Sequence, residues 1–446
     1  MKRFYILAAV LFFIPALLLA EDRSIPLNEA LRLALEKNNL IRAAEYEKEA
    51  ADHGVSVSRS RYLPRILLDE SFSSTNSPTR AFMMKLDQAR LSENDLLINN
   101  LNRPSSTNNF RTALTLEQPL VDLSIGYGSA MAERDAEGKN LSLERRREEI
   151  GYRLFSACLE AQKAEAMLEI TSRAVMDARE HLRLAKVRTE AGMGLKSDEL
   201  RAATFLAERE QQEITAKNKV VLAGMRLSLL TGGTGGETVR IREKIIPPQL
   251  KLSGREVLLL ALKNRKELQE MAKETEKAGV AVKIAESAFF PTLYASATYE
   301  MNDRDTPFYQ DNNAWVVGAN LRWELFDGMR RGGERSRARA RQNAAGEYLL
   351  EQEKEIAFQA RESLLQREEA GKRLEVAGAA QMDAAEGVRL ISKRFSNSLA
   401  AMIELLDAQT ALNRARATVV ENEADYAQAT ARVWYTAGIF LKEVMK

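Results

Sequence analysis

Two carboxylates one helical turn apart are the residues best placed for chemistry in this 446-residue sequence. Glu404 and Asp407 lie in the stretch RFSNSLAAMIELLDAQTAL, which begins at Arg394. Residues three apart share one face of a helix, so both carboxylates point the same way. Three interpretations are open: a metal or acid/base site, a solvated stripe on a helix, or a charged ring formed where several copies of the chain meet.

The other reactive residue types are scarce. The sequence has one cysteine, Cys158, and two histidines, His53 and His181. A disulfide framework or a thiolate metal cage needs several cysteines, and hydrolytic triads and histidine-rich metal sites need histidines beside other reactive groups. Carboxylates without a nearby histidine suit only a labile hard cation. We therefore predict no catalytic residue, no metal site and no cofactor, and no enzymatic activity.

Charge and composition narrow the class of protein further. Lysine and arginine number 65 against 63 aspartate and glutamate, a net charge of +2, which argues against a nucleic-acid partner. Glycine, proline and aromatic residues are sparse, a composition that favours long helices. The densest basic run, from Arg330 to Arg341, is either a solvated helix face or a contact with lipid phosphates.

Residues 1–20 have a different character from the rest of the chain. Two basic residues precede an apolar run from Phe4 to Ala20, and two acidic residues follow it. This pattern is typical of a secretory signal peptide. The alternative is an uncleaved membrane anchor, against which the short length and the interruption at Pro15 argue. The protein is therefore expected to be exported.

The sequence also repeats itself once. The segment ALEKNNLIRAAEYEKEAADHGVSVSRSRYLPRI, from Ala34, is matched by ALKNRKELQEMAKETEKAGVAVKIAESAFFPTL, from Ala261. Further along, LEQPLVD from Leu116 is matched by LRWELFD from Leu321, in the same order. We interpret the chain as a tandem duplication of one unit of roughly two hundred residues. The predicted organisation is a signal peptide, a first repeat, a linker rich in glycine and proline, and a second repeat, over residues 1–20, 21–230, 231–252 and 253–446.

Each repeat is predicted to open with a helix. Asn28 and Ser253 are suitable N-caps, and these helices should run to Pro64 and Pro291, because proline ends a helix. After each second strand a long helix should follow, over about Asp122 to Glu190 and about Asp327 to Phe395, and some seventy residues span on the order of 100 Å. A short break and a returning helix then complete each repeat.

Alternation of apolar and polar residues marks two strands in each repeat. In AWVVGANLRWEL, from Ala314, every second residue is apolar and forms one face, and FRTALTLE from Phe110 shows the same period. Polar connectors, residues 76–109 and 302–313, separate the strands. Four strands cannot close a barrel, and open sheet edges do not occur in lipid. The chain must therefore associate; three copies would supply twelve strands, although the pattern does not determine the number.

The ALxxN…LP opening, the EQPLVD and WELFDG junctions and the RF…LL-D-AQ motif resemble those of the TolC-like outer-membrane efflux proteins. The resemblance covers nearly the whole mature chain, in both halves. It implies an α+β, mainly α fold in a homotrimer. A twelve-stranded outer-membrane β-barrel, with four strands from each chain, continues into a long α-helical barrel in the periplasm. It implies the exit duct of a tripartite efflux or type I secretion system. Such a duct lies in outer-membrane lipid and passes small molecules or proteins from a periplasmic adaptor and an inner-membrane pump.

The resemblance also bears on the two carboxylates. It places Glu404 and Asp407 in an acidic ring at the periplasmic aperture, where six carboxylates would attract cations. Phe395 and Ala400 stand where the family has a tyrosine and an arginine of its gate, so polar partners are lost there. In the first repeat Asp198 corresponds to the first acid and an arginine to the second, so the ring is not duplicated. The main alternative is a periplasmic coiled-coil adaptor or structural protein, which would need neither the strands nor the repeat.

Overall fold

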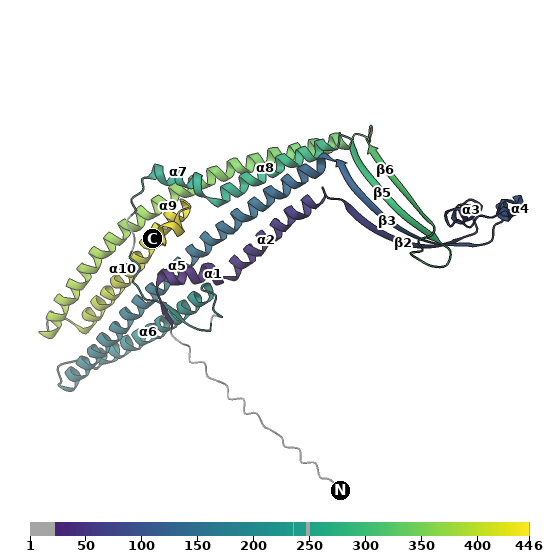
Figure 1. The fold of residues 1–446 in the computed structure, drawn as a ribbon. Coiled ribbons are helices and arrows are strands. Elements are labelled where there is room, and N and C mark those ends of the chain that lie inside the picture. The colour runs from purple at the N-terminus through teal and green to yellow at the C-terminus, as the bar shows by residue number, and fades with distance from the viewer. Residues whose placement is uncertain (1–22, 235, 247–249, 446) are drawn as a thin grey trace, which may run out of the picture. The chain divides into compact units, whose positions relative to one another are not determined.

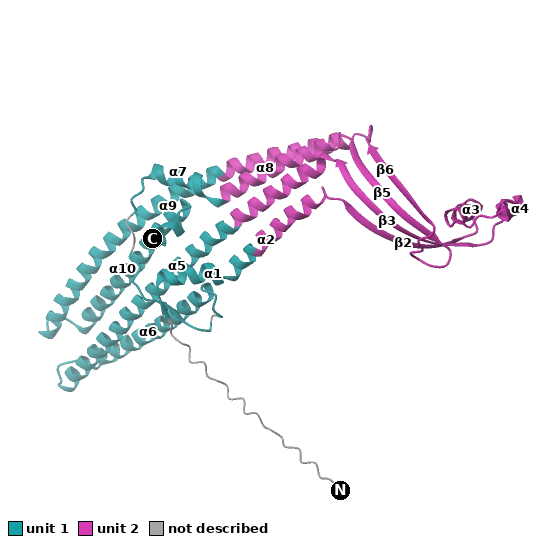
Figure 2. Ribbon diagram, in the orientation of Figure 1, with its two compact units in different colours: residues 1–45, 143–266, 353–446 teal, residues 46–142, 267–352 magenta. Residues whose placement is uncertain are grey.

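The computed structural model describes residues 23–234, 236–246 and 250–445 (Figure 1). The predicted signal peptide lies outside these residues. The chain divides into two compact units, each built from separate parts of the sequence (Figure 2). Unit 1 comprises residues 1–45, 143–266 and 353–446, and unit 2 comprises residues 46–142 and 267–352. Each unit takes segments from both halves of the chain.

Helices make up most of the described chain. They are α1 (Leu27–Lys37), α2 (Asn39–Ser60), α3 (Pro78–Asp87), α4 (Ile98–Asn102), α5 (Leu123–Glu190), α6 (Lys196–Leu230), α7 (Gly254–Asn264), α8 (Lys266–Ser287), α9 (Arg330–Ser396), α10 (Met402–Thr436) and α11 (Phe440–Val444), with a 3₁₀ turn, η1, at Glu93–Leu96. The two long helices predicted from the sequence are confirmed as α5 and α9. No helix in the described ranges is both long enough and apolar enough to cross a membrane.

The opening segment of each repeat differs from its prediction, because it forms two helices instead of one. The first breaks at Asn38, whose backbone is extended and whose side chain accepts a hydrogen bond from the Leu40 amide at 3.0 Å. The Asn38 amide group also donates to the Leu230 carbonyl at 3.3 Å. The second breaks at Arg265, again in an extended conformation. The helices that follow end at Ser60 and Ser287, shortly before the proline-led strands.

The two predicted N-caps have opposite outcomes. Asn28 lies inside α1, which begins one residue earlier with Pro26 at the N-cap, so that prediction is wrong. Proline is accommodated there because the amide it lacks would have no partner in the first turn. Ser253 does cap α7: its hydroxyl oxygen accepts from the Glu256 amide at 3.3 Å, and the Glu256 carboxylate accepts from the Ser253 amide at 2.7 Å. This reciprocal pair is a capping box.

The predicted strands form one antiparallel sheet in unit 2. Its members are β2 (Arg65–Thr75), β3 (Thr107–Val121), β5 (Thr292–Asp303) and β6 (Asn313–Arg322), in the spatial order β2-β3-β5-β6. Within the described part of the chain, β2 pairs only with β3 and β6 only with β5, so both outer strands keep one unpaired edge.

The two faces of this sheet have opposite chemistry. The register places on one face, here called the apolar face, a set of exposed apolar side chains: Ile66, Leu68, Phe72, Leu114, Leu116, Tyr299, Trp315, Val317 and Leu321. On the other, here called the polar face, Arg111 pairs with Glu300 at 2.6 Å and the hydroxyls of Thr115 and Thr298 lie 3.1 Å apart. Side chains alternate between faces along a strand, so the alternating sequence produces this division directly.

The connector between β2 and β3 is more structured than the sequence predicts. Residues 76–106, here called the insertion, contain α3, η1 and α4 instead of an irregular polar loop. The linker between the repeats is also structured, because β4 (Val239–Ile241) pairs in parallel with β1 (Arg23–Ile25). Neither strand of that small sheet was predicted.

Unit 1 contains the largest apolar core. It joins α1, α2, α5, α6, α10 and α11 through buried residues that include Leu31, Ile41, Ile150, Leu154, Leu227, Trp434 and Phe440. Tyr152 stacks on Tyr435 with ring centroids 4.6 Å apart. Cys158 lies in the same core, and burial raises the pKa of its thiol to about 12, so it remains protonated and acts as a packing residue.

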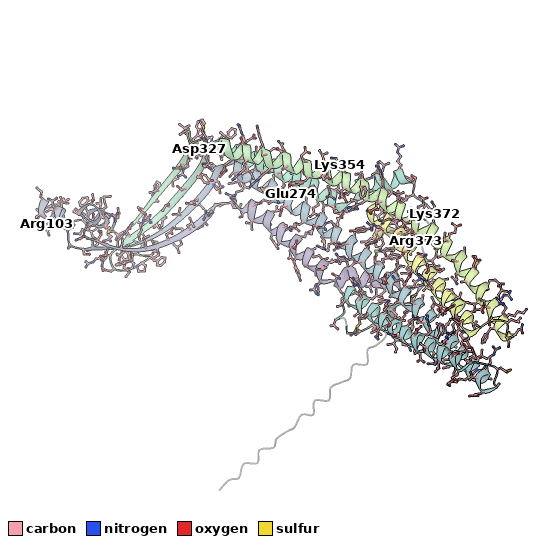
Figure 3. The ribbon with its side chains drawn as sticks, turned by 180° about the vertical axis from the view of Figure 1, so that it is seen from behind. Arg103, Glu274, Asp327, Lys354, Lys372 and Arg373 are labelled. Carbon is pink, nitrogen blue, oxygen red and sulfur yellow. The ribbon has the colours of Figure 1, made fainter. Side chains whose placement is uncertain are left out.

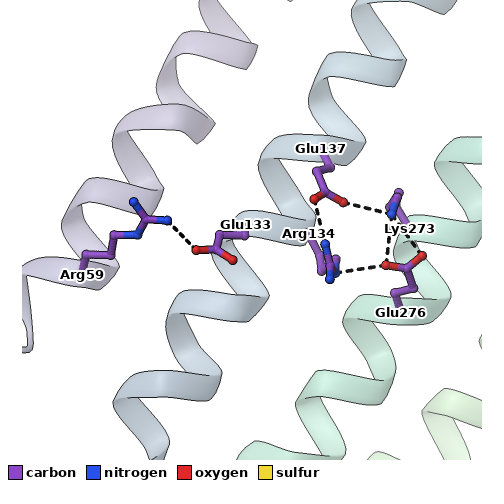
Figure 4. A network of polar contacts seen from close by, with 6 residues as sticks. All are labelled: Arg59, Glu133, Arg134, Glu137, Lys273 and Glu276. Atoms are coloured by element: carbon purple, nitrogen blue, oxygen red, sulfur yellow. Dashed lines mark hydrogen bonds and ion pairs between the residues drawn. The ribbon is translucent and has the colours of Figure 1, made fainter.

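In unit 2 the helices are linked largely by charged pairs. Arg134 on α5 contacts Glu276 on α8 at 3.0 Å, and Lys273 on α8 contacts Glu137 on α5 at 3.0 Å (Figure 4). The hydrogen bond from Lys273 lowers the pKa of Glu137, although partial burial opposes the shift. Arg59 of α2 reaches another α5 glutamate at 2.6 Å. Exposed pairs of this kind contribute roughly 0–1 kcal/mol each, so they set register more than stability.

Two glycines give a matched test of the unit 1 packing. Gly438 has φ +68°, and a Cβ there would lie 2.9 Å from the Asn264 backbone, whereas Gly378 in α9 has no heavy atom within 4 Å of that position. Gly438→Ala should lower the thermal midpoint of the helical circular dichroism signal, because a left-handed residue costs roughly 1–2 kcal/mol before any clash. Gly378→Ala should raise it, because alanine in place of glycine at a compatible position stabilises the fold by about 0.4–1 kcal/mol. Equal shifts would contradict this account.

Candidate functional site

The carboxylate pair lies at one end of unit 1, where two helical hairpins turn. Residues 191–195 join α5 to α6, and residues 397–401 join α9 to α10 (Figure 1). Both turns contain a residue in the left-handed region, Gly192 with φ 75° and Ser398 with φ 60°. A second apolar cluster packs the two hairpins together; it contains Ala178, Ala185, Ala202, Phe205, Phe395, Met402, Leu405 and Leu406.

Glu404 has a local structural role that the sequence prediction missed. Its carboxylate accepts a hydrogen bond at 3.1 Å from the amide of Ala401, the residue that precedes α10. Ala401 has no side-chain acceptor, so only half of a capping box is formed. An acid in the first turn also interacts favourably with the positive end of the helix dipole. Glu404 therefore helps α10 to begin at Met402.

Asp407 lies on the same exposed face of α10, as the spacing predicts. Unlike that of Glu404, its carboxylate makes no hydrogen bond or ion pair to another residue that the structure describes. The neighbouring Leu405 and Leu406 are buried in the cluster between the hairpins, while Ile403 is 43% exposed. The apolar residues around the pair thus face inward or outward according to helical phase, and they do not bury the acids.

The arrangement gives no support to metal binding within one chain. Among the residues that the structure describes, no three histidine, cysteine or acidic side chains are grouped closely enough to hold a metal ion. Two exposed carboxylates can attract mobile cations without binding one tightly. Of the three original interpretations, the solvated stripe and the charged ring are compatible with this geometry.

Phe395 and Ala400, the predicted gate positions, both belong to the cluster that packs the hairpins together. Phe395 is buried, and Ala400 packs against the edge of the cluster. Phe395 nevertheless takes part in a polar contact, because the Arg188 guanidinium of α5 donates to its carbonyl oxygen at 2.8 Å. The same guanidinium lies 4.2 Å from the centre of the Phe395 ring. Arg188 therefore fastens the end of α9 to α5.

Arg188 and its counterpart in the second repeat act differently. Arg394 donates to the Leu399 carbonyl at 3.1 Å and so closes its own turn, whereas Arg188 crosses to the other hairpin. The offset of 206 residues that aligns Asp198 with Glu404 also aligns Arg188 with Arg394, but an alignment carries no information about this crossing contact. Asp198, the first-repeat counterpart of Glu404, lies in the first turn of α6 and is also exposed or nearly so.

The basic run that begins at Arg330 is not simply a solvated helix face. Arg331 is buried at the junction between β6 and α9, next to Asp327, which Figure 3 labels. The Asp327 carboxylate accepts from the Arg331 amide at 2.9 Å and from its guanidinium at 3.0 Å. Burial opposes ionisation, but these hydrogen bonds and the neighbouring positive charges hold the pKa of Asp327 below its usual range. The guanidinium also donates to the Ala288 and Leu325 carbonyls, at 3.2 and 3.3 Å.

Comparison with known proteins decides the family. The model of the outer membrane efflux protein family matches residues 30–233 and again residues 257–438. The chain belongs to this family. It is 24% identical over 443 residues to the alkaline protease secretion protein AprF of Pseudomonas aeruginosa, a match covering 95% of this chain and 86% of AprF.

Solved structures show the same fold at low identity. The CmeC outer membrane channel of Campylobacter jejuni superposes with a TM-score of 0.80 at 17% identity, covering 94% of this chain and 89% of that one. The open state of the MtrE outer membrane channel of Neisseria gonorrhoeae gives 0.76 at 16% identity, covering 93% and 89%. The predicted TolC-like fold class, mainly helical with a small sheet, is confirmed. So are the outer-membrane location, with extension into the periplasm, and the class of function, an exit duct.

The capping role of Glu404 can be tested separately from any ring. Glu404→Ala should speed hydrogen exchange at the Ala401 amide and weaken the first turn of α10 by about 0.3–1.5 kcal/mol, because that amide loses its acceptor. Glu404→Gln retains an acceptor oxygen and should exchange more slowly than the alanine variant. Asp407→Ala is the matched control and should leave the Ala401 amide unchanged. Equal exchange rates in all three variants would contradict the cap.

The Arg188 contact makes a second prediction for the same region. Arg188→Ala should lower the free energy of opening of residues 397–401 by roughly 1.5–3 kcal/mol, because the charged donor to the Phe395 and Ser396 carbonyls is lost. Hydrogen exchange of the Ser398 and Leu399 amides measures this opening. Arg183→Ala, one turn earlier on α5, removes only an exposed pair with Glu180 and should have little effect. Similar exchange in both variants would mean that Arg188 does not fasten α9.

Proposed function

We propose that three copies of this chain form the outer-membrane duct of an export system that also contains a periplasmic adaptor and an inner-membrane pump. The two unpaired edges of the sheet carry the proposal. In hydrocarbon every backbone amide and carbonyl must find a partner within the protein, and only a closed barrel provides this for strands. Pairing β6 of one copy with β2 of the next closes such a barrel, and three copies supply twelve strands. We therefore propose the homotrimer that the sequence predicts.

The faces of the sheet assign the two sides of this barrel. The apolar face, with Leu114 and Trp315 among its exposed residues, is the side that can meet lipid tails. The polar face, with the Arg111–Glu300 pair, then lines the lumen. An arginine facing lipid at the bilayer midplane would cost roughly 2–4 kcal/mol, which argues against the opposite assignment for Arg111.

The cargo of the duct is proposed from its relatives. AprF, similar over 95% of this chain, is named as a protease secretion protein, which favours a type I secretion system and a polypeptide cargo. The family is named for efflux, which is also compatible with a small-molecule cargo. The periplasmic adaptor or coiled-coil alternative accounts for the long helices but leaves the four-stranded sheet without a role.

The division into two tandem repeats is likewise a proposal. The same family model matches each half separately, at residues 30–233 and 257–438. Each half also has the same order of main elements: a short strand, two opening helices, two sheet strands, a long helix and a returning helix. The insertion interrupts this order in the first half only.

We further propose that Glu404 and Asp407 of three copies form a ring of six carboxylates at the periplasmic aperture. Their exposure on α10, beside the turn that ends the second hairpin, supports this location. The Asp407 carboxylate is available to ions, whereas Glu404 also caps its helix. A ring of mutually close carboxylates attracts cations and repels anions.

Planar-bilayer conductance tests the ring. The unmodified trimer is expected to give discrete steps with a preference for potassium over chloride. The double variant Glu404→Gln, Asp407→Asn should move that preference toward unity, because it removes the charge while keeping an acceptor for the Ala401 amide. Asp198→Asn is the matched control and should keep the preference. Unchanged selectivity in the double variant would reduce the pair to a solvated stripe on α10.

The duct itself is tested by mass and by membrane insertion. The protein extracted in detergent should have three times the mass of the chain, and it should insert into liposomes and resist extraction at high salt. A folded monomer that does not insert would contradict the duct and favour the periplasmic adaptor.

A further inference from the structure

The insertion, residues 76–106, packs on the polar face of the sheet. Ala81 of α3 is fully buried, as are Asn109 and Ala113 of β3, whose side chains belong to the polar face. Asp87 at the end of α3 also lies close to Glu300 and Arg111 of that face: burial and the Glu300 carboxylate raise the pKa of Asp87, and Arg111 opposes them. The insertion therefore lies on the side of the sheet that the proposed function assigns to the lumen.

A relay of amide side chains fixes the insertion to the sheet. Gln88, almost completely buried, donates to the Asn109 side-chain oxygen at 2.7 Å and to the Asn108 carbonyl at 2.7 Å. Asn109 in turn donates to the Asn302 side chain on β5 at 2.9 Å. Because buried amides are costly to leave unpaired, this relay holds the end of α3 in one position on two strands.

The insertion is also held together internally. Lys85 of α3 donates to the Asp95 carboxylate of η1 at 2.6 Å, and Asp95 accepts from the Ser92 amide at 3.0 Å. These hydrogen bonds, chiefly the one from Lys85, lower the pKa of Asp95 to about 2. The folded pKa is below the usual value of 3.8, so this stabilisation is present above that pH and is lost as the pH falls toward 2. The insertion is a small folded unit at neutral pH.

This unit leaves large apolar side chains exposed. They lie on α3, η1 and the start of α4, and they are Met83, Leu86, Leu96, Leu97 and Ile98. The most exposed of them is Ile98, at 79%. It is here called the insertion patch. The insertion follows the polar end of β2, Ser73–Thr75. An apolar patch on a fixed, water-exposed unit marks a surface that something else covers.

The position of the patch indicates that a second copy of the chain covers it. Lipid tails contact the opposite face of the sheet, so they do not reach the side on which α3 lies. The insertion follows directly after β2, the strand whose free edge pairs with the neighbouring copy in the proposed trimer. Around a threefold axis, three identical apolar surfaces on the lumenal side face one another.

We infer that the three insertions pack their patches against one another inside the outer mouth of the duct and close it by contact between copies. The inference rests on the proposed trimer. Its physical basis is the pairing of three apolar surfaces that would otherwise face a water-filled lumen. The closure is non-covalent and involves one short segment of each chain.

Disulfide trapping tests the contact in the full-length trimer. Ile98→Cys, or Leu97→Cys if the first variant does not fold, should form a cross-linked dimer of chains on mild oxidation, with one thiol of each trimer left unpaired. The native Cys158 is buried and serves as the unreactive background. Asn76→Cys is the matched control: this exposed residue lies at the barrel rim, where copies are separated by the width of the barrel, and should not cross-link.

The outcomes separate the inference from the proposed function. A trimer of correct mass that shows no cross-link at Leu97 or Ile98 overturns the inference and leaves the duct intact. Labelling of the Ile98→Cys thiol by a maleimide dissolved in the bilayer, without cross-linking, would assign the patch to lipid and also overturn it. A protein that is monomeric in detergent and does not insert into liposomes overturns the duct itself. Ile98→Asp supplies a second readout: its open probability in bilayers should exceed that of the unmodified trimer.

Discussion

The requirement that no backbone hydrogen-bonding group remain unpaired in hydrocarbon governs the architecture of this chain. In the sheet of β2, β3, β5 and β6, the inner strands β3 and β5 are hydrogen-bonded along both edges, whereas β2 and β6 each keep one unpaired edge. A monomer with this sheet cannot reside in a bilayer, because each unsatisfied amide or carbonyl there costs several kcal/mol. Association is therefore a condition of the membrane-embedded state, and not a later addition to a stable subunit.

The two units depend on association to different degrees. Unit 1 has a substantial apolar core that includes Leu154, Trp434 and Phe440, and this core can form within one chain. In unit 2 the helices are connected mainly by exposed ion pairs such as Lys273–Glu137, which contribute little net stability. Unit 2 also carries the exposed apolar face of the sheet. It follows that folding of unit 2 is coupled more strongly than that of unit 1 to the neighbouring copies and to lipid.

Periodic patterns in the sequence predicted the main helices and strands well. Structural features that depend on contacts between residues distant in the sequence were not predicted. Alternation located the sheet strands, and the composition, poor in glycine and proline, favoured the long helices α5 and α9. The breaks at Asn38 and Arg265 were missed, because each depends on the surroundings of a single residue, such as the Asn38 bond to Leu230. The insertion was predicted as a loop because its composition is polar on average, although α3 and η1 are held by a specific pair between Lys85 and Asp95.

The candidate site shows the same limit at closer range. Helical spacing correctly placed Glu404 and Asp407 on one exposed face, but spacing could not distinguish their roles. Glu404 accepts a hydrogen bond from the Ala401 amide, which ties part of its charge to the start of α10. Asp407 has no such partner among the described residues, so its charge is not shared with another group. In the proposed ring of six carboxylates, Asp407 is therefore the free acid of each chain, and Glu404 also stabilises the start of the helix that carries both.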